Sequence, residues 1–287
     1  MHINFKYFIV SIGSIFIALG IGILIGSSLG TNESIQKQNA SIIKDIDSKV
    51  NDLQAVNDEL NIENKQAQKN IDDFKTYLSN NNKTLIQSGL SNKKIGIISF
   101  DEDSTSSLVS NVITSTGGEV SFYITIKNSI NQDDALQKIN EKLDKKLEKK
   151  EDLENLIVDS IKVSNTDGRL SVLQDLGYIK INGFINTFDN VTNIIVNNTM
   201  DAKNTKVEEF QGGFIGKIKS LKPTIVAQKS GSEVDMAKTF SKYRISTLSN
   251  VDEQWSYINL VTLINEKDLI GNFGKIDDNS SLLAISK

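Results

Sequence analysis

The chain holds few side chains of the kinds that do chemistry. Its 287 residues include no cysteine and a single histidine, His2, at the amino terminus. A thiolate nucleophile, a zinc–thiolate site and a disulfide are therefore excluded, and a Ser-His pair is excluded beyond the terminus. We predict that the protein is not an enzyme and has neither a cofactor nor a metal site.

Three adjacent carboxylates, Asp101, Glu102 and Asp103, follow the first predicted strand. Open α/β sheets bind ligands at the carboxyl ends of their strands, where such carboxylates can hold Mg²⁺ or Ca²⁺. Acidic residues in this place also cap the following helix and match the positive end of its dipole. The capping interpretation is the stronger of the two.

A glycine-rich run late in the chain looks faintly like a phosphate-binding loop: Gly212-Gly213-Phe214-Ile215-Gly216-Lys217. It lacks the G-x-x-x-x-G-K-[ST] spacing and follows a polar helical stretch rather than a strand. Nucleotide binding therefore has no support. Because the net charge is −4, we also expect no nucleic-acid partner.

An uncharged apolar stretch from Tyr7 to Leu29 predicts a membrane anchor. No charge lies between Lys6 and Glu33, and a helix over Tyr7–Leu29 would be about 34 Å long, enough to cross a bilayer core of about 30 Å. A cleaved signal peptide is the main alternative, with Ser28-Leu29-Gly30 as a small-x-small site, but the run is longer than a usual signal core. A buried soluble helix is the third interpretation, although the stretch has no polar face.

Small residues recur at every fourth position of the anchor, and we predict that they form a dimer face in the membrane. Such a ridge lets two helix backbones approach closely in lipid. Glycine and serine are also simply frequent in transmembrane helices, which is the alternative explanation. The residues are Ser14, Ala18, Gly22, Gly26 and Gly30.

Beyond Glu33 the apolar pattern changes to a heptad, which predicts a parallel coiled coil that dimerises the protein. Every predicted core position is apolar except Asn57 and Asn64, and a buried Asn at position a favours a parallel, in-register dimer. A single amphipathic helix folded back on its own domain is the alternative. The a positions are Ile43, Val50, Asn57, Asn64, Ile71 and Leu78, and the d positions are Ile46, Leu53, Leu60, Ala67 and Phe74.

The remainder alternates predicted strands with helices, which is typical of a Rossmann-like α/β domain with a mainly parallel sheet. We expect the coiled-coil helix to end at Asn80–Asn82. We predict strands over 95–100, 119–126, 191–196, 224–227, 245–248 and 282–285, and helices over 104–116, 132–150, 151–161, 206–221, 233–243 and 252–266. The domains are then an anchor (1–32), a coiled coil (33–82) and the α/β domain (83–287).

Two parts of the chain resemble the bacterial MctB-type family. They are the start, with Ile3-Asn4-Phe5-Lys6-Tyr7 and Phe16-Ile17-Ala18-Leu19-Gly20, and two late blocks, Ser249-Asn250-Val251-Asp252 and Gly271-Asn272-Phe273-Gly274. The family is labelled a copper transport protein. Its relatives called SteB look like partners of a membrane protein, SteA, in daughter-cell separation and control of wall hydrolases. The resemblance implies an extracytoplasmic C-terminal region, whereas Lys37, Lys44 and Lys49 after the anchor weakly favour the opposite orientation.

The chain has few side chains that could bind Cu(I), although the family is labelled a copper transport protein. Cu(I) prefers thiolate, thioether or imidazole, and the chain offers only His2, Met1, Met200 and Met236. We therefore expect a membrane-anchored, homodimeric coiled-coil scaffold or regulator with a SteA-like membrane protein or an envelope hydrolase system as partner. A copper-homeostasis component and a ligand-sensing or enzymatic α/β domain are the alternatives.

Overall fold

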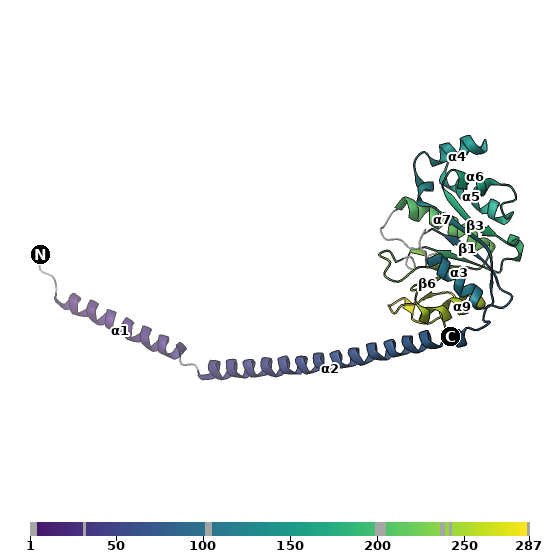
Figure 1. Cartoon of the computed structure of the whole chain (residues 1–287). Helices are drawn as coiled ribbons and strands as arrows, with labels where there is room; N and C mark the ends of the chain where they lie inside the picture. The colour runs from purple at the N-terminus through teal and green to yellow at the C-terminus, as the bar shows by residue number, and fades with distance from the viewer. Residues whose placement is uncertain are drawn as a thin grey trace. The chain divides into compact units, whose positions relative to one another are not determined.

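The computed structural model describes residues 5–30, 33–100, 105–198, 205–235, 239–240 and 243–285. The chain divides into two units, Met1–Ile71 and Asp72–Lys287, and helix α2 (Glu33–Leu85) contributes to both. Figure 1 shows the elements of both units. Asp101, Glu102 and Asp103 lie outside the described residues, as do His2, Met1, Met200 and Met236.

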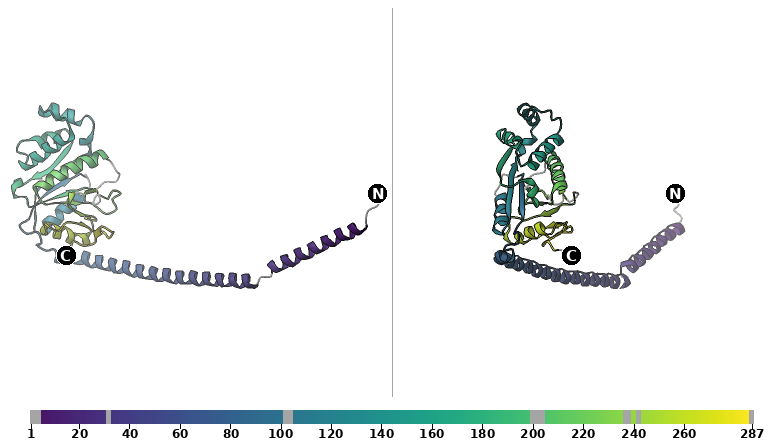
Figure 2. Two further views of the ribbon diagram at one scale, coloured as in Figure 1. Left: turned by 180° about the vertical axis from the view of Figure 1, so that it is seen from behind. Right: turned by 90° about the vertical axis from the view of Figure 1, so that its right-hand side faces the viewer.

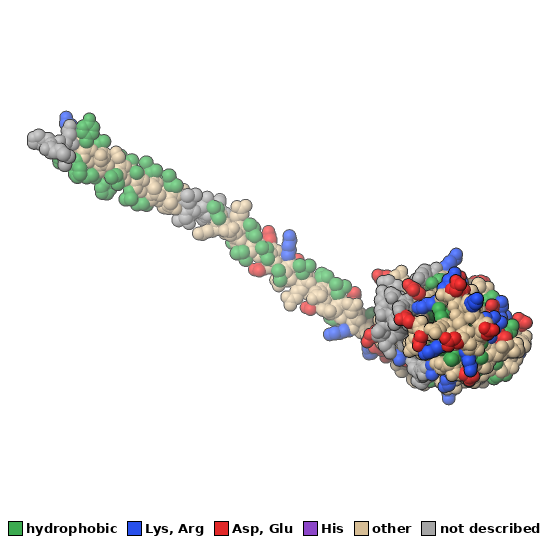
Figure 3. Space-filling view, turned by 90° about the horizontal axis from the view of Figure 1, so that it is seen from above, with side chains coloured by type: hydrophobic (Ala, Val, Ile, Leu, Met, Phe, Trp, Pro, Cys, Tyr) green, Lys and Arg blue, Asp and Glu red, His purple; other side chains and the backbone are tan. Residues whose placement is uncertain are grey.

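The first unit contains helix α1 (Phe5–Gly30), which confirms the apolar helix predicted over Tyr7–Leu29. Within Phe5–Ser28, the most apolar window of 18 residues has a mean hydropathy of 2.7, and none of that window is buried within the chain. Among the described residues this is the one helix long and apolar enough to cross a membrane, by length and composition. Hydrophobic side chains are interspersed with other atoms along the visible face of α1 in Figure 3, and acidic side chains appear only from α2 onward.

Helix α2 runs three residues past its predicted end at Asn80–Asn82. The Asn81 side chain donates to the carbonyl of Tyr77 at 2.8 Å, one turn back in the same helix. The amide of Ile86 then donates to the carbonyl of Asn82 at 3.0 Å. The asparagines therefore stay within the helix, because their polar groups are satisfied there.

The second unit is built on one eight-stranded sheet with the order β3-β2-β1-β4-β5-β6-β7-β8. Every pair is parallel except β2 with β3, which is antiparallel, so the predicted α/β class is confirmed. The strands are β1 (Lys94–Ser99), β2 (Glu119–Ile126), β3 (Ile179–Phe184), β4 (Asn193–Asn197), β5 (Thr224–Ala227), β6 (Ser246–Leu248), β7 (Asn272–Phe273) and β8 (Ser280–Ser281).

Alternate side chains of the central strands feed two apolar clusters, one on each face of the sheet. Ile95 and Ile97 of β1 belong to one cluster with Leu260, and Ile98 belongs to the other with Phe122 and Phe214. Figure 2 shows helices on both faces. The helices are α3 (Thr105–Ser115), α4 (Ala135–Leu143), α5 (Lys150–Lys162), α6 (Arg169–Asp175), α7 (Thr205–Leu221) and α9 (Tyr257–Asn265), with short 3₁₀ turns at Asn128–Asn131, Phe188–Asn190 and Gln254–Ser256.

The charged helix predicted over 132–150 is wrong in its second half, because α4 ends at Leu143. Asp144 takes a left-handed conformation with φ of 48°. The Asn140 side chain then donates to the carbonyl of Leu147 at 2.9 Å and accepts from its amide at 2.7 Å, which closes a loop. Asp152 accepts from the amide of Lys149 at 3.1 Å and caps the start of α5.

Several smaller elements differ from prediction. Helix α6 and strands β3 and β7 were not predicted, and the last strand is Ser280–Ser281 rather than 282–285. The helix predicted over 252–266 begins as a 3₁₀ turn at Gln254. Residues 233–235 of the helix predicted over 233–243 are not helical, and part of the remainder lies outside the described residues.

Candidate functional site

The small residues predicted to form a membrane dimer face lie along one ridge of α1, because a four-residue spacing follows a ridge of the helix surface. The Ser14 hydroxyl donates to the carbonyl of Val10 at 2.7 Å and is satisfied within its own helix. Within the described chain, nothing lies within 4 Å of the position that a Cβ would take at Gly22 or Gly26. Ala18, between Ser14 and Gly22, is exposed, so the ridge is open to a neighbour from Ser14 to Gly26. Gly30 is the last residue of α1.

The predicted coiled-coil positions form an exposed apolar stripe on α2. The exposed fraction is 69% for Leu53 and 51% for Leu60. Asn57 and Asn64 are exposed on the same stripe, and Ile71 is half-buried. The other exposed members are Ile43, Ile46, Val50, Ala67 and Phe74.

The last predicted core position, Leu78, is buried, unlike the earlier positions of the stripe. This side chain is only 5% exposed, buried within the second unit. One turn earlier, the Lys75 ammonium lies 4.8 Å from the centroid of the Trp255 ring, a cation–π contact within the same unit. The predicted dimer position Leu78 is therefore occupied by the chain's own domain, and the surface available to another helix ends at Phe74.

A buried polar cluster joins the two strands where the strand order reverses, β1 and β4. The Ser106 hydroxyl of α3 donates to the hydroxyl of Ser99 at 2.8 Å. The side-chain amide of Asn197 donates to the hydroxyl of Ser106, also at 2.8 Å. The side-chain amide of the next residue, Asn198, donates to the side-chain oxygen of Gln211 in α7 at 2.8 Å. These bonds fasten α3 and α7 to the carboxyl edge, where open α/β sheets bind ligands.

The two late blocks that carried the family resemblance meet at the ends of β6 and β7. The Ser249 amide donates to the carbonyl of Phe273 at 2.9 Å, and the Asn250 side chain donates to the carbonyl of Gly274 at 2.8 Å. A Cβ at Gly274 would stand 2.0 Å from the Ser249 carbonyl oxygen, and its φ is +93°, so only glycine fits. These residues hold the sheet together.

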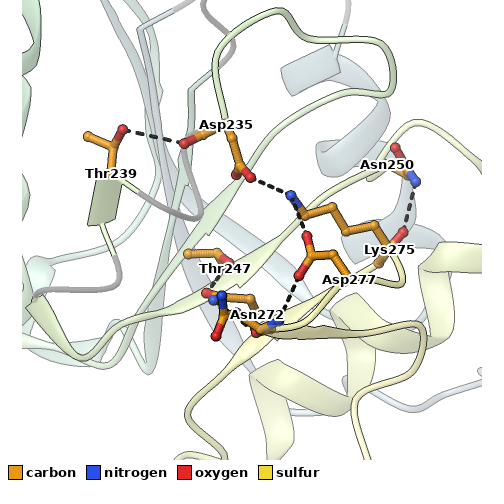
Figure 4. Close-up of polar contacts among 9 residues, drawn as sticks. Asp235, Thr239, Thr247, Asn250, Asn272, Lys275 and Asp277 are labelled. Carbon is orange, nitrogen blue, oxygen red and sulfur yellow. Dashed lines mark hydrogen bonds and ion pairs between the residues drawn. The ribbon is translucent and has the colours of Figure 1, made fainter. Parts of the chain in front are cut away.

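An ionic cluster lies beside this junction (Figure 4). The Lys275 ammonium pairs with Asp235 and, at 3.0 Å, with Asp277. Burial lowers the pKa of Lys275, but the hydrogen bonds to the two carboxylates outweigh it, and the pKa is raised. The backbone amide of Asn279 and then Lys275 lower the pKa of Asp277 to about 2. The cluster ties the segment before Thr239 to the chain after β7.

The glycine-rich run 212–217 lies inside α7 and makes no phosphate loop. A Cβ at Gly213 would stand 2.5 Å from the carboxylate of Glu154, so the glycine lets α5 and α7 pack closely. Lys217 pairs with Glu154 at 3.3 Å and with Glu151 at 3.7 Å. Burial raises the pKa of Glu154, and the bond to Lys217 opposes that rise. Sequence periodicity does not predict this ion pair between a buried carboxylate and a partly exposed lysine.

The described residues do not fit a copper site. They contain no group of three or more His, Cys, Asp or Glu side chains arranged to hold a metal ion. The side chains that Cu(I) prefers, His2 and the three methionines, all lie outside the described residues. No copper coordination follows from the described geometry.

Comparison with known proteins places the chain in one family. The family model described as "Copper transport outer membrane protein, MctB" matches residues 2–283. A comparison with curated proteins found no match. The family match covers the apolar helix, α2 and nearly all of the α/β domain, so it does not rest on one short motif. The chain belongs to the MctB family of copper transport outer membrane proteins.

Proposed function

We propose that the protein is a membrane-anchored scaffold in which two copies pair through α1 and α2 and present their α/β domains to partners in the cell envelope. The observation that carries this proposal is the exposed apolar stripe of α2 from Ile43 to Phe74. An isolated helix that leaves such a stripe in water gains nothing from its apolar side chains. Burial against the same stripe of a second copy removes them from water.

The heptad favours a second copy over an unrelated partner. In a parallel, in-register pair, Asn57 and Asn64 each meet their own counterpart across the axis and can hydrogen-bond there. An unrelated apolar helix would leave these amides without partners. The ridge of α1 carries Gly22 and Gly26 on one side, which suits a close approach of two anchors in lipid.

The orientation and the partner rest on the family resemblance. We infer that the α/β domain lies outside the cytoplasm and that a SteA-like membrane protein or an envelope hydrolase system is its partner in cell separation. A single-cysteine variant, Lys145→Cys, tests the orientation, because the chain has no cysteine of its own and Lys145 is exposed. Labelling of whole cells by a membrane-impermeant maleimide is expected; labelling only after lysis would reverse the orientation.

Disulfide formation in native membranes tests the pairing. Ile46→Cys and Leu60→Cys, both at position d, should each cross-link on oxidation, because facing d side chains point toward each other across the axis of a parallel pair. Ile62→Cys is the matched control: it lies two residues from Leu60, is 68% exposed and faces away from the stripe.

The two d positions also report the direction of the pair. An antiparallel pair can bring only one of Ile46 and Leu60 opposite itself, so cross-linking of both variants indicates a parallel register. Equal cross-linking of Ile62→Cys would show random collision, and no cross-linking at any of the three positions would refute the dimer.

Copper handling is the second candidate function, and the family match over residues 2–283 favours it. The cargo would have to meet the few soft ligands of the chain, Met1, His2, Met200 and Met236. Competition of the full-length protein with a Cu(I) chelator tests this function. Stoichiometric binding that is lost in Met200→Ala or Met236→Ala would favour copper handling over the scaffold; background binding would leave the scaffold favoured.

A further inference from the structure

A cavity of about 450 Å³ opens at the amino ends of β4, β5 and β6, at the edge of the sheet opposite the polar cluster. It lies between the last turn of α7 and the segment that follows α9, and it includes Lys219, Leu221, Glu266 and Ile270 in its walls. Its size falls within the roughly 300–1,000 Å³ of small-molecule sites. Neither the α2 stripe nor the late blocks contribute to it.

Arg244, in the cavity wall, has an unusual backbone for its residue type. Its φ is +52°, and the other described non-glycine residues with positive φ are all short polar residues: Ser88, Asn92, Asp144, Ser164, Asn165 and Asn250. Those side chains tolerate the left-handed region, whereas a long side chain is strained there. The ammonium of Lys219 donates to the carbonyl of Tyr243 and fixes the residue before Arg244. Such strain is a known feature of ligand sites.

The charged side chains of the wall are not paired with one another. The Arg244 guanidinium is exposed, and no ion pair joins it to any residue that the structure describes. The same holds for Lys267, Glu266 and Asp268, which also line the cavity. Helices α7 and α9 both end here and direct the negative ends of their dipoles toward this edge. The wall therefore offers cations for one group of a ligand and acceptors for another.

The remaining lining is apolar, with one buried amide. Leu221, Ile245 and Leu269 line the cavity. The Asn193 side chain donates to the carbonyl of Ile264 at 3.1 Å, while its buried side-chain oxygen has no hydrogen-bond partner in the described chain. An unpaired buried acceptor favours a ligand that brings an N–H or O–H group.

We infer that this cavity binds a small zwitterion with an aliphatic body, an aliphatic α-amino acid or a short peptide of such residues. The carboxylate pairs with Arg244, the ammonium faces Glu266 and Asp268, and the hydrocarbon lies on the apolar wall. This site is independent of the scaffold role and of copper handling, because it uses none of the residues on which those functions depend.

Calorimetry on the full-length protein in lipid nanodiscs tests the inference with L-leucine and L-leucyl-L-leucine. Two analogues each lack one charge of leucine: 4-methylpentanoate has no ammonium, and 3-methylbutylamine has no carboxylate. Each should bind at least about tenfold more weakly than leucine, since each loses one charge-assisted interaction. Tighter binding of the dipeptide would point to peptides rather than free amino acids as the source.

Variants separate the two halves of the site. Arg244→Gly removes the guanidinium at a position whose backbone suits glycine, and it should weaken leucine at least about tenfold while leaving 3-methylbutylamine unchanged. The double variant Glu266→Gln plus Asp268→Asn should do the reverse, weakening the amine and not 4-methylpentanoate. Lys145→Gln, an exposed charge on a distant loop, should change neither. Leucine that bound no better than its analogues, bound equally to Arg244→Gly, or did not bind saturably would overturn the inference.

Discussion

The heptad core positions of α2 are exposed in one stretch of the helix and buried in another. Leu60 and Leu78 are both leucines at predicted core positions of α2, yet Leu60 is 51% exposed and Leu78 is 5% exposed. The first belongs to the unit Met1–Ile71 and the second to the unit Asp72–Lys287. The stripe is exposed at Leu60 in the first unit, whereas at Leu78 it is buried within the fold of the second unit.

The difference shows what a heptad can and cannot specify. The repeat identifies which face of a helix must leave water, but it does not identify what covers that face. At Leu78 the chain's own domain covers it, and from Ile43 to Leu60 no described part of the chain does. We therefore expect changes in the first unit to alter association, and changes in the second unit to alter unfolding.

The largest effect is expected at Leu78. Leu78→Ala should lower the free energy of unfolding of the second unit by about 2–5 kcal/mol, because it leaves a cavity in a packed site. Leu60→Ala should leave that free energy unchanged and weaken association instead. Trp255, the only tryptophan, lies beside Lys75 in the second unit and reports its unfolding by fluorescence in urea.

The same two variants can also show that Leu60 and Leu78 do not differ in role. Light scattering of the full-length protein in detergent measures association for each. If Leu78→Ala weakened association as strongly as Leu60→Ala and left the urea midpoint unchanged, Leu78 would belong to the intermolecular seam, as the heptad alone predicts.

The asparagines of the stripe should give the next largest effect. Asn57→Leu plus Asn64→Leu should stabilise the assembly by about 1–3 kcal/mol for each polar group no longer buried, and should loosen the choice of oligomer. Sedimentation of the full-length protein would then show species larger than the dimer. Asn61→Leu, at a neighbouring polar position off the stripe, is the control. An unchanged, single oligomer in the double variant would mean that these amides are not buried between copies.

The sequence predicted the regular parts of this fold and failed where a single polar contact decided the outcome. Strands β1, β2 and β5 are rich in β-branched and apolar residues, and their bounds agree with prediction within one residue. The end of α4 depends on the bonds between Asn140 and Leu147, and the edge strand β3 alternates too weakly to be recognised. The amino-acid sequence of these segments does not indicate which side chain will bond to which backbone group.

The candidate sites divide in the same way. The stripe of α2 and the ridge of α1 are periodic and were therefore predictable. The cavity with Arg244 gathers Asn193, Arg244 and Glu266 from three separate segments, each without a motif. Residues brought together by the topology of the sheet leave no pattern in a single sequence. Such a site could not be predicted before the strand order was known.

The anchor should show a smaller effect than the coiled coil. Gly22→Ile plus Gly26→Ile keeps α1 apolar, so insertion should persist, while the added bulk separates two helices and removes contacts worth about 1–2 kcal/mol. Gly13→Ile plus Gly20→Ile, at glycines off the ridge, is the matched control. Energy transfer between labelled full-length copies in vesicles measures the association, and equal losses in both double variants would remove the ridge from the dimer face.

A substitution in the second unit should also be able to stabilise the fold without changing association. Arg244→Gly should raise the free energy of unfolding by about 1 kcal/mol, because glycine adopts positive φ without strain. Arg244→Gln keeps the strain and removes the charge, and it should not raise the urea midpoint. Equal midpoints for Arg244→Gly and the unaltered protein would show that the left-handed backbone is not strained.

The smallest expected effect is the pH dependence of the second unit. Burial raises the pKa of Glu154 above 4.5, so the folded state holds this proton more tightly than the unfolded state does. Its contribution to stability is therefore complete below pH 4.5 and is lost as the pH rises through the folded pKa. Asp277 behaves in the opposite way: with its pKa lowered from 3.8 to about 2, its contribution is present above pH 3.8 and is lost as the pH falls toward 2.

Urea midpoints followed by Trp255 fluorescence across this range separate the two groups. Glu154→Gln should flatten the decline above pH 4.5 and leave the acid side unchanged, whereas Asp277→Asn should flatten only the acid side. The oligomeric state should be the same in all three proteins at each pH, because both carboxylates lie in the second unit. A Glu154→Gln variant whose deficit in stability grew as the pH rose above 4.5 would show that the Glu154–Lys217 ion pair, at 3.3 Å, outweighs the burial of the carboxylate.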